Sequence, residues 1–535
     1  MQIGGGADGS RGSDLVTGSA GTTDPVRSSG GVSDVGSGGS HSGTGGSREA
    51  SPRTGGTAGT GGIAGQGGLP SSGQGASTPD AGFRVDSLVA DARAAGEAID
   101  SPLVDASRSA DASDANLTRE VGADRRVSLD TMPCLHEFSN PSCWAIQDLA
   151  VIHPNGTLFG GVYDGKRVYF PSSIRGGLAG WYNGGKTGVG EMLSYDPQGD
   201  FTADSSWTVF STPDVSPAAF AFAGAIFDGR YIYFPPFNPA AESVALRYDT
   251  SAGFSQATSW AAADLEKFNS AYSPVAYVGG AFDGRYAYFV PNCTYEYWNG
   301  LVLRYDSQGT FADKASWSLF DTQTLDYDAG GFIGVAFDGQ YLYFAPWGDL
   351  SSNTSHSKAT PITRFDTRAS FTSASSWMTF DALKVSPTAG FGGAVFDSRY
   401  VYFLPGDYQP GDVVLRYDTK ADFASPSSWT GFGVSAIARR TTRFMGGVFD
   451  GRYLYLVPTA TGDVAVRYDT SADFGSAASW AAFDLKAWDA RADGYGGGVF
   501  DGRSVYFVPA FGHEIVRFEA YSTPVKQSPL PASFL

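Results

Sequence analysis

The chain has 535 residues, 71 of them glycine, and a formal net charge of −18 at pH 7. This acidic balance disfavours nucleic acid or an anionic membrane surface as a partner, because both repel negative charge. No apolar run reaches the roughly 18 residues that a membrane-spanning helix needs, so we expect no transmembrane segment.

Residues 1–132 differ from the rest of the chain. Residues 1–80 are rich in glycine, serine and threonine, and residues 81–132 are rich in aspartate and alanine. Such segments bury too little apolar surface to offset the entropy of ordering, so we predict a disordered tail or stalk. The segment Met1–Gly6 has no basic region followed by an apolar stretch, and no signal peptide is visible in this sequence.

From residue 133 onward the chain repeats one phrase, in which a glycine precedes a stretch of the form Phe-Asp-Gly-Arg-Tyr-x-Tyr-Phe-x-Pro. The aspartate recurs at intervals of 51 to 64 residues, which predicts an array of similar structural units. Asp-Gly between two alternating apolar stretches predicts a tight β-hairpin. The seven aspartates are Asp164, Asp228, Asp283, Asp338, Asp397, Asp450 and Asp501.

Two positions of the hairpin carry conformational information. Glycine follows the aspartate in six copies, but Ser398 stands there in the fifth, so we expect a costlier backbone or another turn type at this residue. Glycine also stands four residues before every aspartate, as Gly224 does before Asp228. That position predicts a close approach of the inner strands around an axis.

Each unit continues with two further predicted strands. The third carries Arg-Tyr-Asp or a close variant, as in Arg247–Asp249, and the fourth begins at a tryptophan six residues after a phenylalanine, as at Phe254 and Trp260. Four antiparallel strands per unit predict a propeller blade. We interpret the repeated aspartate as a turn residue, and we expect the third-strand arginine to pair with a carboxylate of its own blade.

The seventh unit has no tryptophan of its own, because the chain ends 34 residues after Asp501. Ahead of the first unit, however, Phe138 and Trp144 show the same six-residue offset, and Trp144 precedes Asp164 by the same 20 to 23 residues as in the other units. We therefore predict an all-β fold, a seven-bladed β-propeller over residues 133–535 whose last blade is closed by the N-terminal strand around Trp144.

The unit resembles the kelch repeat in strand order and in its tyrosine and tryptophan positions, as in Gly392–Pro405 followed by Val414–Asp418 and Trp429. It departs from kelch where that repeat has a double glycine after the second strand, since this chain has x-Pro there. The resemblance implies a kelch-like propeller. A glycine- and serine-rich stalk before a propeller is also similar to exported surface proteins and lipoproteins of bacteria, which implies an extracellular or cell-surface location; a cytoplasmic location is the alternative.

Signals for catalysis or metal binding are sparse. The five histidines are far apart in sequence, and the chain contains no H-E-x-x-H, C-x-x-C, phosphate loop or G-x-S-x-G. We expect no cofactor and no metal. Cys134 and Cys143 flank the closing strand, and two interpretations stay open: a disulfide in an oxidising compartment with Cys293 free, or three unpaired thiols.

The connections from second to third strands and from blade to blade vary in length and content, and in a propeller they share one face. Variable loops on a rigid scaffold are where binding residues usually lie, and tryptophan and tyrosine dominate binding surfaces. We predict a non-enzymatic, monomeric binding or adhesion module for a glycan or protein partner. The alternatives are a glycan-acting hydrolase or lyase with paired carboxylates at the central channel, and a structural cell-surface protein. The candidate ligand-binding residues are Trp181, Tyr182, Tyr295, Tyr297, Trp298, Trp347, Tyr408 and His513.

Overall fold

The structure is a computed structural model of the chain. It describes residues 134–524, apart from 155–156, 175–187, 239–242, 269–275, 294–297, 349–360, 389, 407–410, 440, 442 and 460–461. The tail predicted for residues 1–132 therefore lies outside the described residues.

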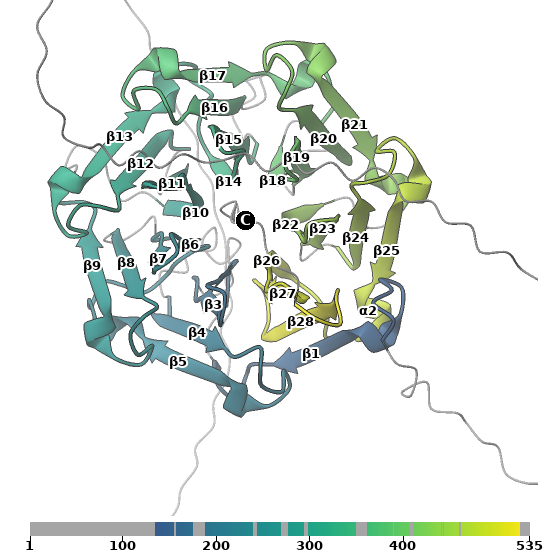
Figure 1. The fold of residues 1–535 in the computed structure, drawn as a ribbon, viewed down its shortest axis with the longest axis horizontal. Coiled ribbons are helices and arrows are strands. Elements are labelled where there is room, and N and C mark those ends of the chain that lie inside the picture. The colour runs from purple at the N-terminus through teal and green to yellow at the C-terminus, as the bar shows by residue number, and fades with distance from the viewer. Residues whose placement is uncertain are drawn as a thin grey trace, which may run out of the picture. The chain divides into compact units, whose positions relative to one another are not determined.

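Residues 144–519 form seven four-stranded antiparallel sheets arranged as blades around an axis, which confirms the predicted propeller (Figure 1). Within each blade the strands follow chain order from the axis outward, except in blade 7, whose outermost strand comes from the N-terminal side. Blades 1 to 4 are β2 (Val162–Tyr163), β3 (Val168–Pro171), β4 (Glu191–Tyr195) and β5 (Trp207–Ser211); β6 (Ile226–Phe227), β7 (Tyr231–Phe234), β8 (Val244–Asp249) and β9 (Trp260–Asp264); β10 (Ala276–Phe282), β11 (Tyr286–Cys293), β12 (Leu301–Asp306) and β13 (Trp317–Asp321); and β14 (Phe332–Phe337), β15 (Tyr341–Pro346), β16 (Ile362–Asp366) and β17 (Trp377–Phe380). Blades 5 to 7 are β18 (Phe391–Phe396), β19 (Tyr400–Pro405), β20 (Val413–Asp418) and β21 (Trp429–Gly433); β22 (Phe444–Phe449), β23 (Tyr453–Pro458), β24 (Val464–Asp469) and β25 (Trp480–Asp484); and β26 (Tyr495–Phe500), β27 (Ser504–Pro509), β28 (Glu514–Glu519) and β1 (Trp144–Asp148).

Helical structure among the described residues is limited to short turns. One turn of 3-10 helix precedes the tryptophan of every outermost strand: Pro141–Cys143, Asp204–Ser206, Ala257–Ser259, Lys314–Ser316, Ala374–Ser376, Pro426–Ser428 and Ala477–Ser479. Further turns follow some of these strands: Thr212–Asp214, Thr322–Thr324, Ala382–Lys384, Val434–Ala436 and the short helix α2 (Leu485–Trp488). No helix in the described ranges has the length and apolarity needed to cross a membrane.

The N-terminal strand closes the ring as predicted. β1 pairs antiparallel with β28, with Trp144 opposite Phe518 and Asp148 opposite Glu514. The indole N–H of Trp144 donates to the carbonyl of Phe138 at 3.0 Å, and the tryptophan of every other blade makes the same bond to the phenylalanine six residues before it. The six-residue offset seen in the sequence is therefore the span of this indole bond.

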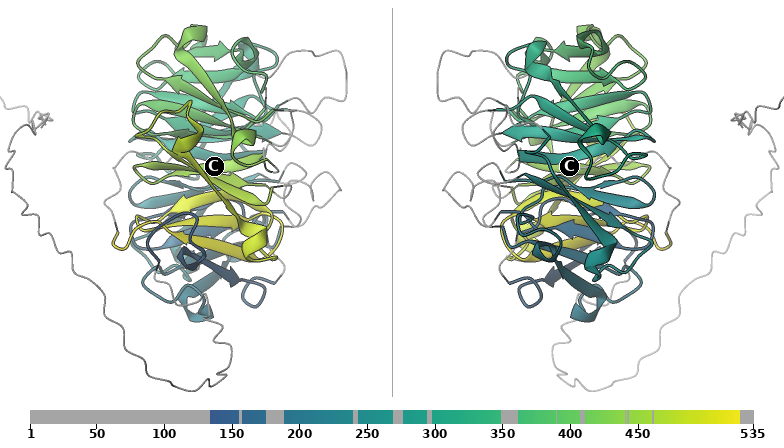
Figure 2. Two further views of the ribbon diagram at one scale, coloured as in Figure 1. Left: turned by 90° about the vertical axis from the view of Figure 1, so that its right-hand side faces the viewer. Right: turned by 90° about the vertical axis from the view of Figure 1, so that its left-hand side faces the viewer.

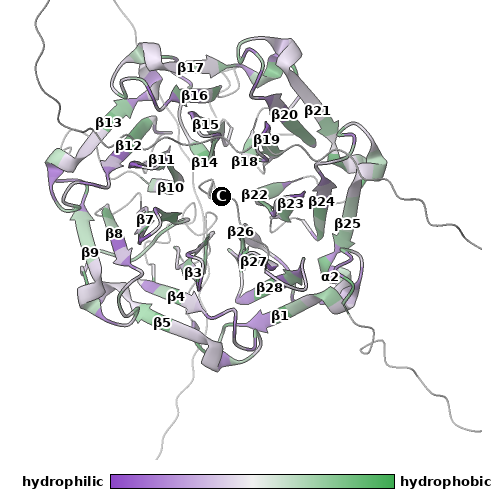
Figure 3. Ribbon diagram, viewed as in Figure 1, coloured by the Kyte–Doolittle hydropathy of each residue, from purple (hydrophilic) through white to green (hydrophobic). Residues whose placement is uncertain are grey.

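The core lies between neighbouring sheets, where hydrophobic side chains of adjacent blades interlock (Figure 3). At the axis the first strands approach one another closely. The backbone N–H of Gly224 donates to the carbonyl of Phe159 in blade 1 at 2.8 Å, and that of Gly279 donates to Ala223 in blade 2 at 2.7 Å. A Cβ on Gly224 would lie 2.7 Å from the Cα of Gly279, so this position requires glycine, as predicted.

Ser398 takes the backbone conformation that glycine takes in the other hairpins. Its φ is 87°, against 102° at Gly229 and 101° at Gly284. The turn type is thus kept, and the serine adopts the costlier left-handed backbone that the sequence predicts as one of two outcomes.

The ring has two faces, seen edge-on in Figure 2. We call one the turn face, because the Asp-Gly hairpins and the connections from third to fourth strands emerge there. The opposite face carries the connections from second to third strands and from each blade to the next, and we call it the loop face.

Candidate functional site

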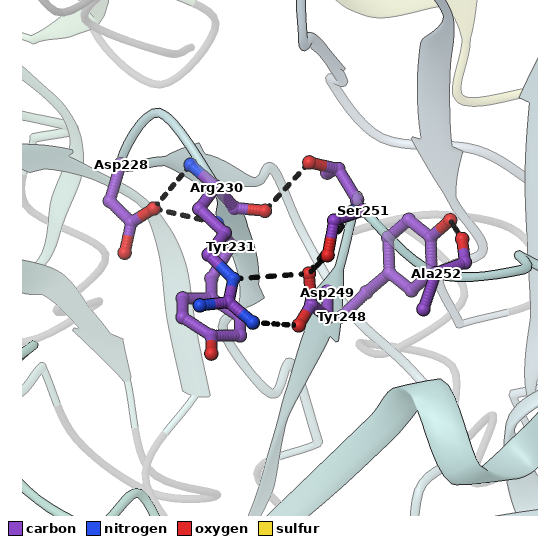
Figure 4. A network of polar contacts seen from close by, with 8 residues as sticks. Asp228, Arg230, Tyr231, Tyr248, Asp249, Ser251 and Ala252 are labelled. Atoms are coloured by element: carbon purple, nitrogen blue, oxygen red, sulfur yellow. Dashed lines mark hydrogen bonds and ion pairs between the residues drawn. The ribbon is translucent and has the colours of Figure 1, made fainter.

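The repeated aspartates of the turn face are fully used by their own hairpins. In blade 2, Asp228 Oδ1 accepts from the backbone N–H groups of Arg230 and Tyr231 at 2.8 and 2.6 Å, and Oδ2 accepts from the Tyr233 hydroxyl at 2.5 Å (Figure 4). The same three bonds recur at the aspartates of the other hairpins. These carboxylates act as turn scaffolds and offer no sevenfold ligand site.

The third-strand arginines do not pair with carboxylates in the described part of the chain, so that expectation was wrong. The guanidinium of Arg304 instead lies 4.1 Å from the ring centre of Tyr286 in its own blade and 4.3 Å from that of Phe371 in the next. Arg364, Arg416 and Arg467 lie between two rings in the same way. Such cation–π contacts join neighbouring blades.

The ion pairs come from the hairpin arginines. Arg230 donates to Asp249 at 2.7 Å, and equivalent pairs join the hairpin and third strand in blades 3, 5, 6 and 7. Figure 4 shows how the Arg230–Asp249 pair and the Asp228 bonds form one local network. The polar groups repeated on the turn face therefore stabilise the blades.

The loop face of blades 7 and 1 departs from the repeat. The register position that opens the third strand holds valine or leucine in blades 2, 3, 5 and 6, but Glu191 in blade 1 and Glu514 in blade 7. The connection after β1 also holds His153, and the residue before β28 is His513. Carboxylates and imidazoles thus gather where the other blades are apolar.

In blade 1, His153 Nδ1 makes a short contact with Glu191 Oε2. The His153 side chain is 1% exposed, and its Nε2 has no hydrogen-bond partner. Ser173 is also buried, with an Oγ that lacks a partner. Buried polar atoms are almost always hydrogen-bonded, so two such atoms in one blade need an explanation beyond the fold.

In blade 7, three further atoms lack partners: Asp493 Oδ1, the Tyr495 hydroxyl and His513 Nδ1. Tyr495 is 1% exposed, and burial raises its pKa well above the usual range, with added repulsion from Asp493, Glu514 and Asp489. Its hydroxyl therefore stays protonated and can both donate and accept a hydrogen bond.

The two groups adjoin the same connection. Leu149 donates its backbone N–H to the carbonyl of His513 at 3.0 Å and accepts the N–H of His153 at 2.7 Å. We call His153, Ser173, Glu191, Asp493, Tyr495, His513 and Glu514 the closure-face cluster. No group of three histidine, cysteine or acidic side chains suited to a metal ion occurs among the described residues. The cluster is equipped for hydrogen bonding to a polar ligand.

No protein-family model matches the chain, and no curated protein matches it. Solved structures are similar only at the level of the fold. A chain in the crystal structure of the mitotic checkpoint complex is 10% identical, with 76% of this chain and 100% of that chain covered at a TM-score of 0.41. Dihydro-heme d1 dehydrogenase NirN in complex with DHE is 12% identical over 70% of this chain and 67% of that chain, at a TM-score of 0.36.

Of the predicted ligand-binding aromatics, Trp298 and Trp347 lie in the described residues. Trp347 is 1% exposed, so the expectation that it projects into solvent is wrong. It packs edge to face on the partly buried Trp298, with ring centres 5.8 Å apart, because Trp347 directly follows β15 and its backbone N–H bonds to Gly331. Trp181, Tyr182, Tyr295, Tyr297 and Tyr408 lie outside the described residues.

His513 is the predicted site residue that the structure places in the closure-face cluster. Sequence reasoning missed Tyr495, Glu191, Glu514 and His153. Their signal was present as departures from the repeat, at positions that become comparable once the seven copies are aligned by strand register. Cys134 and Cys143 are joined by a disulfide, and Cys293 is free and buried, which raises the pKa of its thiol.

Proposed function

We propose that this chain is a non-enzymatic binding module, a kelch-like propeller exported to the cell surface, that binds a glycan on its loop face. One observation supports this most directly. The repeated carboxylates of the turn face are used by the scaffold, whereas the loop face of blades 7 and 1 carries buried polar atoms without partners. A polar ligand is what such atoms accommodate.

Exposed apolar groups flank the same place. Val151 is 78% exposed in the connection that contains His153, and Phe511 is 37% exposed in the connection before His513. Binding sites combine apolar surface with a few placed polar groups, so this pairing suits a sugar, which has both apolar and hydroxyl-bearing sides. The Cys134–Cys143 disulfide supports an oxidising compartment.

Two steric variants of the full-length protein test the proposal on a glycan array. Val151→Trp adds bulk to the loop face beside blade 1, and Lys166→Trp adds equal bulk to an exposed turn-face residue of the same blade. We expect the first to abolish binding and the second to leave it unchanged. Loss of binding in Lys166→Trp alone, or an array without bound glycans, contradicts the proposal. Shortened glycan products would instead indicate a hydrolase or lyase.

A further inference from the structure

The strand register shows that the Tyr495 hydroxyl is not needed for the fold. The residue six positions before the hairpin aspartate opens the first strand next to the core, and it is phenylalanine in blades 2, 4, 5 and 6. In full, the seven residues at this position are Leu158, Phe222, Tyr277, Phe332, Phe391, Phe444 and Tyr495. A buried apolar ring satisfies this site, so the unpartnered hydroxyl of Tyr495 costs stability that phenylalanine would keep. Violations of this kind are expected at functional positions.

Other polar groups surround this hydroxyl. Asp493 lies two residues away on the same strand side, with Oδ2 bound to Lys486 Nζ at 2.6 Å and Oδ1 unpartnered. Glu514 Oε2 accepts the backbone N–H of His513 at 3.0 Å, and the Glu514 charge acts on Tyr495. Asp493 thus supplies a fixed acceptor, and Tyr495 and His513 supply groups that donate or accept.

An exposed aromatic ring stands beside these groups. The carbonyl of Gly494 accepts the backbone N–H groups of Ala510 and Phe511, at 2.8 and 3.0 Å. Gly494 has a φ of 74°, and a Cβ there would lie 2.8 Å from the Cβ of Phe511. Glycine between Asp493 and Tyr495 therefore brings the Phe511 side chain against the polar group.

We propose that Asp493, Tyr495 and His513 form a binding site for one uncharged saccharide unit, whose apolar side rests on Phe511. This inference rests on the proposed function and names the ligand class of its site. Sugar hydroxyls donate and accept at once, which matches an acceptor oxygen beside two groups that do either. Aromatic rings supply the rigid apolar surface of such contacts.

The charges around Tyr495 exclude acidic sugars. Three carboxylates, Asp489, Asp493 and Glu514, face it. Lys486 pairs with Asp493, and Arg491 binds Asp489 in a bidentate pair at 2.7 and 3.0 Å. Glu514 has no ion pair in the described part of the chain, so the site keeps a net negative charge that repels uronic acids and sulfated sugars.

Calorimetric titration of the full-length protein tests the site, with cellohexaose, xylohexaose and mannohexaose as neutral probes and hexagalacturonate as the acidic probe. We expect at least one neutral sugar to bind and hexagalacturonate not to bind. Tyr495→Phe restores the common residue of the repeat and should fold normally. Loss of one hydrogen bond should weaken its binding about tenfold. Tyr277→Phe, at the same register in blade 3, is the matched control and should bind as the wild type does.

Each other outcome overturns the inference in a distinct way. Equal affinity of Tyr495→Phe and wild type refutes the site but leaves the loop-face proposal intact. Preference for hexagalacturonate refutes the ligand class. Binding of none of the four sugars refutes the inference, and the glycan array with the two steric variants then decides the proposed function separately.

Discussion

The indole of Trp144 stacks on the ring of Phe483 in blade 6, with ring centres 4.4 Å apart and planes 6° apart. The same stack joins Phe210 to Trp260, Phe320 to Trp377, Phe380 to Trp429 and Phe432 to Trp480. The strand borrowed from the N-terminal side is therefore held to its neighbouring blade by the contact that holds strands within the continuous chain. Closure of the ring depends on it as much as on the β1–β28 pairing.

Removal of this strand should be far more damaging than removal of the residues before it. We expect deletion of residues 1–130 to leave a soluble protein that unfolds cooperatively, because β1 and the disulfide remain. Deletion of residues 1–152 removes β1 and exposes the unpaired edge of β28, which should cause aggregation or loss of cooperative unfolding. Urea unfolding and light scattering measure both. A soluble, cooperative product of the longer deletion would refute closure by β1.

The Cys134–Cys143 disulfide should stabilise the turn that leads into β1. The bond spans nine positions of sequence, and Phe138 within the loop is fully packed. We expect Cys143→Ser to lower the free energy of unfolding by about 2–3 kcal/mol under oxidising conditions, since a small loop is no longer closed in the unfolded chain. In the presence of dithiothreitol the variant and the wild type should unfold alike. A difference that persists after reduction would show that the serine acts by another route.

Ser398→Gly should stabilise the protein. Ser398 is exposed and holds a φ of 87°, a conformation that costs a non-glycine residue about 1–2 kcal/mol, while glycine returns part of that gain through the entropy of the unfolded chain. A net gain of roughly 0.5–1 kcal/mol is expected in urea unfolding. The reverse change, Gly284→Ser at the same turn of blade 3, is the matched control and should destabilise. Equal stability in both variants would contradict the strain.

The hairpin ion pairs should make stability fall in acid. The hydrogen bond from Arg230 holds the pKa of Asp249 at about 2, and that from Arg285 lowers the pKa of Asp306. A depressed folded-state pKa stabilises the fold above the unfolded value of about 4, and this contribution is lost as the pH falls towards the folded value. The free energy of unfolding should therefore decrease between about pH 4 and pH 2.

The variant Arg230→Met isolates one of these pairs, since methionine keeps much of the packing on Tyr231 but removes the charge. Its free energy of unfolding should depend less steeply on pH across this acidic range than that of the wild type. Blade 4 offers a natural comparison, because Gln340 faces Asp366 there in place of an arginine. Identical slopes for Arg230→Met and wild type would show that the pair adds nothing to acid stability.

The blade architecture was predictable because each blade is specified locally. The Asp-Gly turn, the six-residue Phe–Trp offset and the position of Trp144 each reflect a contact within one unit or the repeat of one unit seven times. The partner of Arg304 was not predictable in this way, because one of its two rings, Phe371, belongs to the next blade. Trp347 was misjudged for a related reason, since its burial depends on Trp298 of the preceding blade.

The closure-face cluster was harder to predict for a different reason. Its residues come from both ends of the described chain and from blades 7 and 1, and no single stretch contains a recognisable motif. Their common property is disagreement with the repeat, as when Glu191 and Glu514 replace valine or leucine. That property becomes visible only after the strands of all blades are placed in register.

The pairing of β1 with β28 also determines when this protein can fold during its synthesis. β1 leaves the ribosome before every other described strand, but its partner is the last strand to be made. Blades 1 to 6 are each complete in themselves and can form as the chain grows, whereas Trp144 must wait for Phe518. Contacts between residues so distant in sequence form slowly, so the final step of folding should be the docking of a strand that was available from the start.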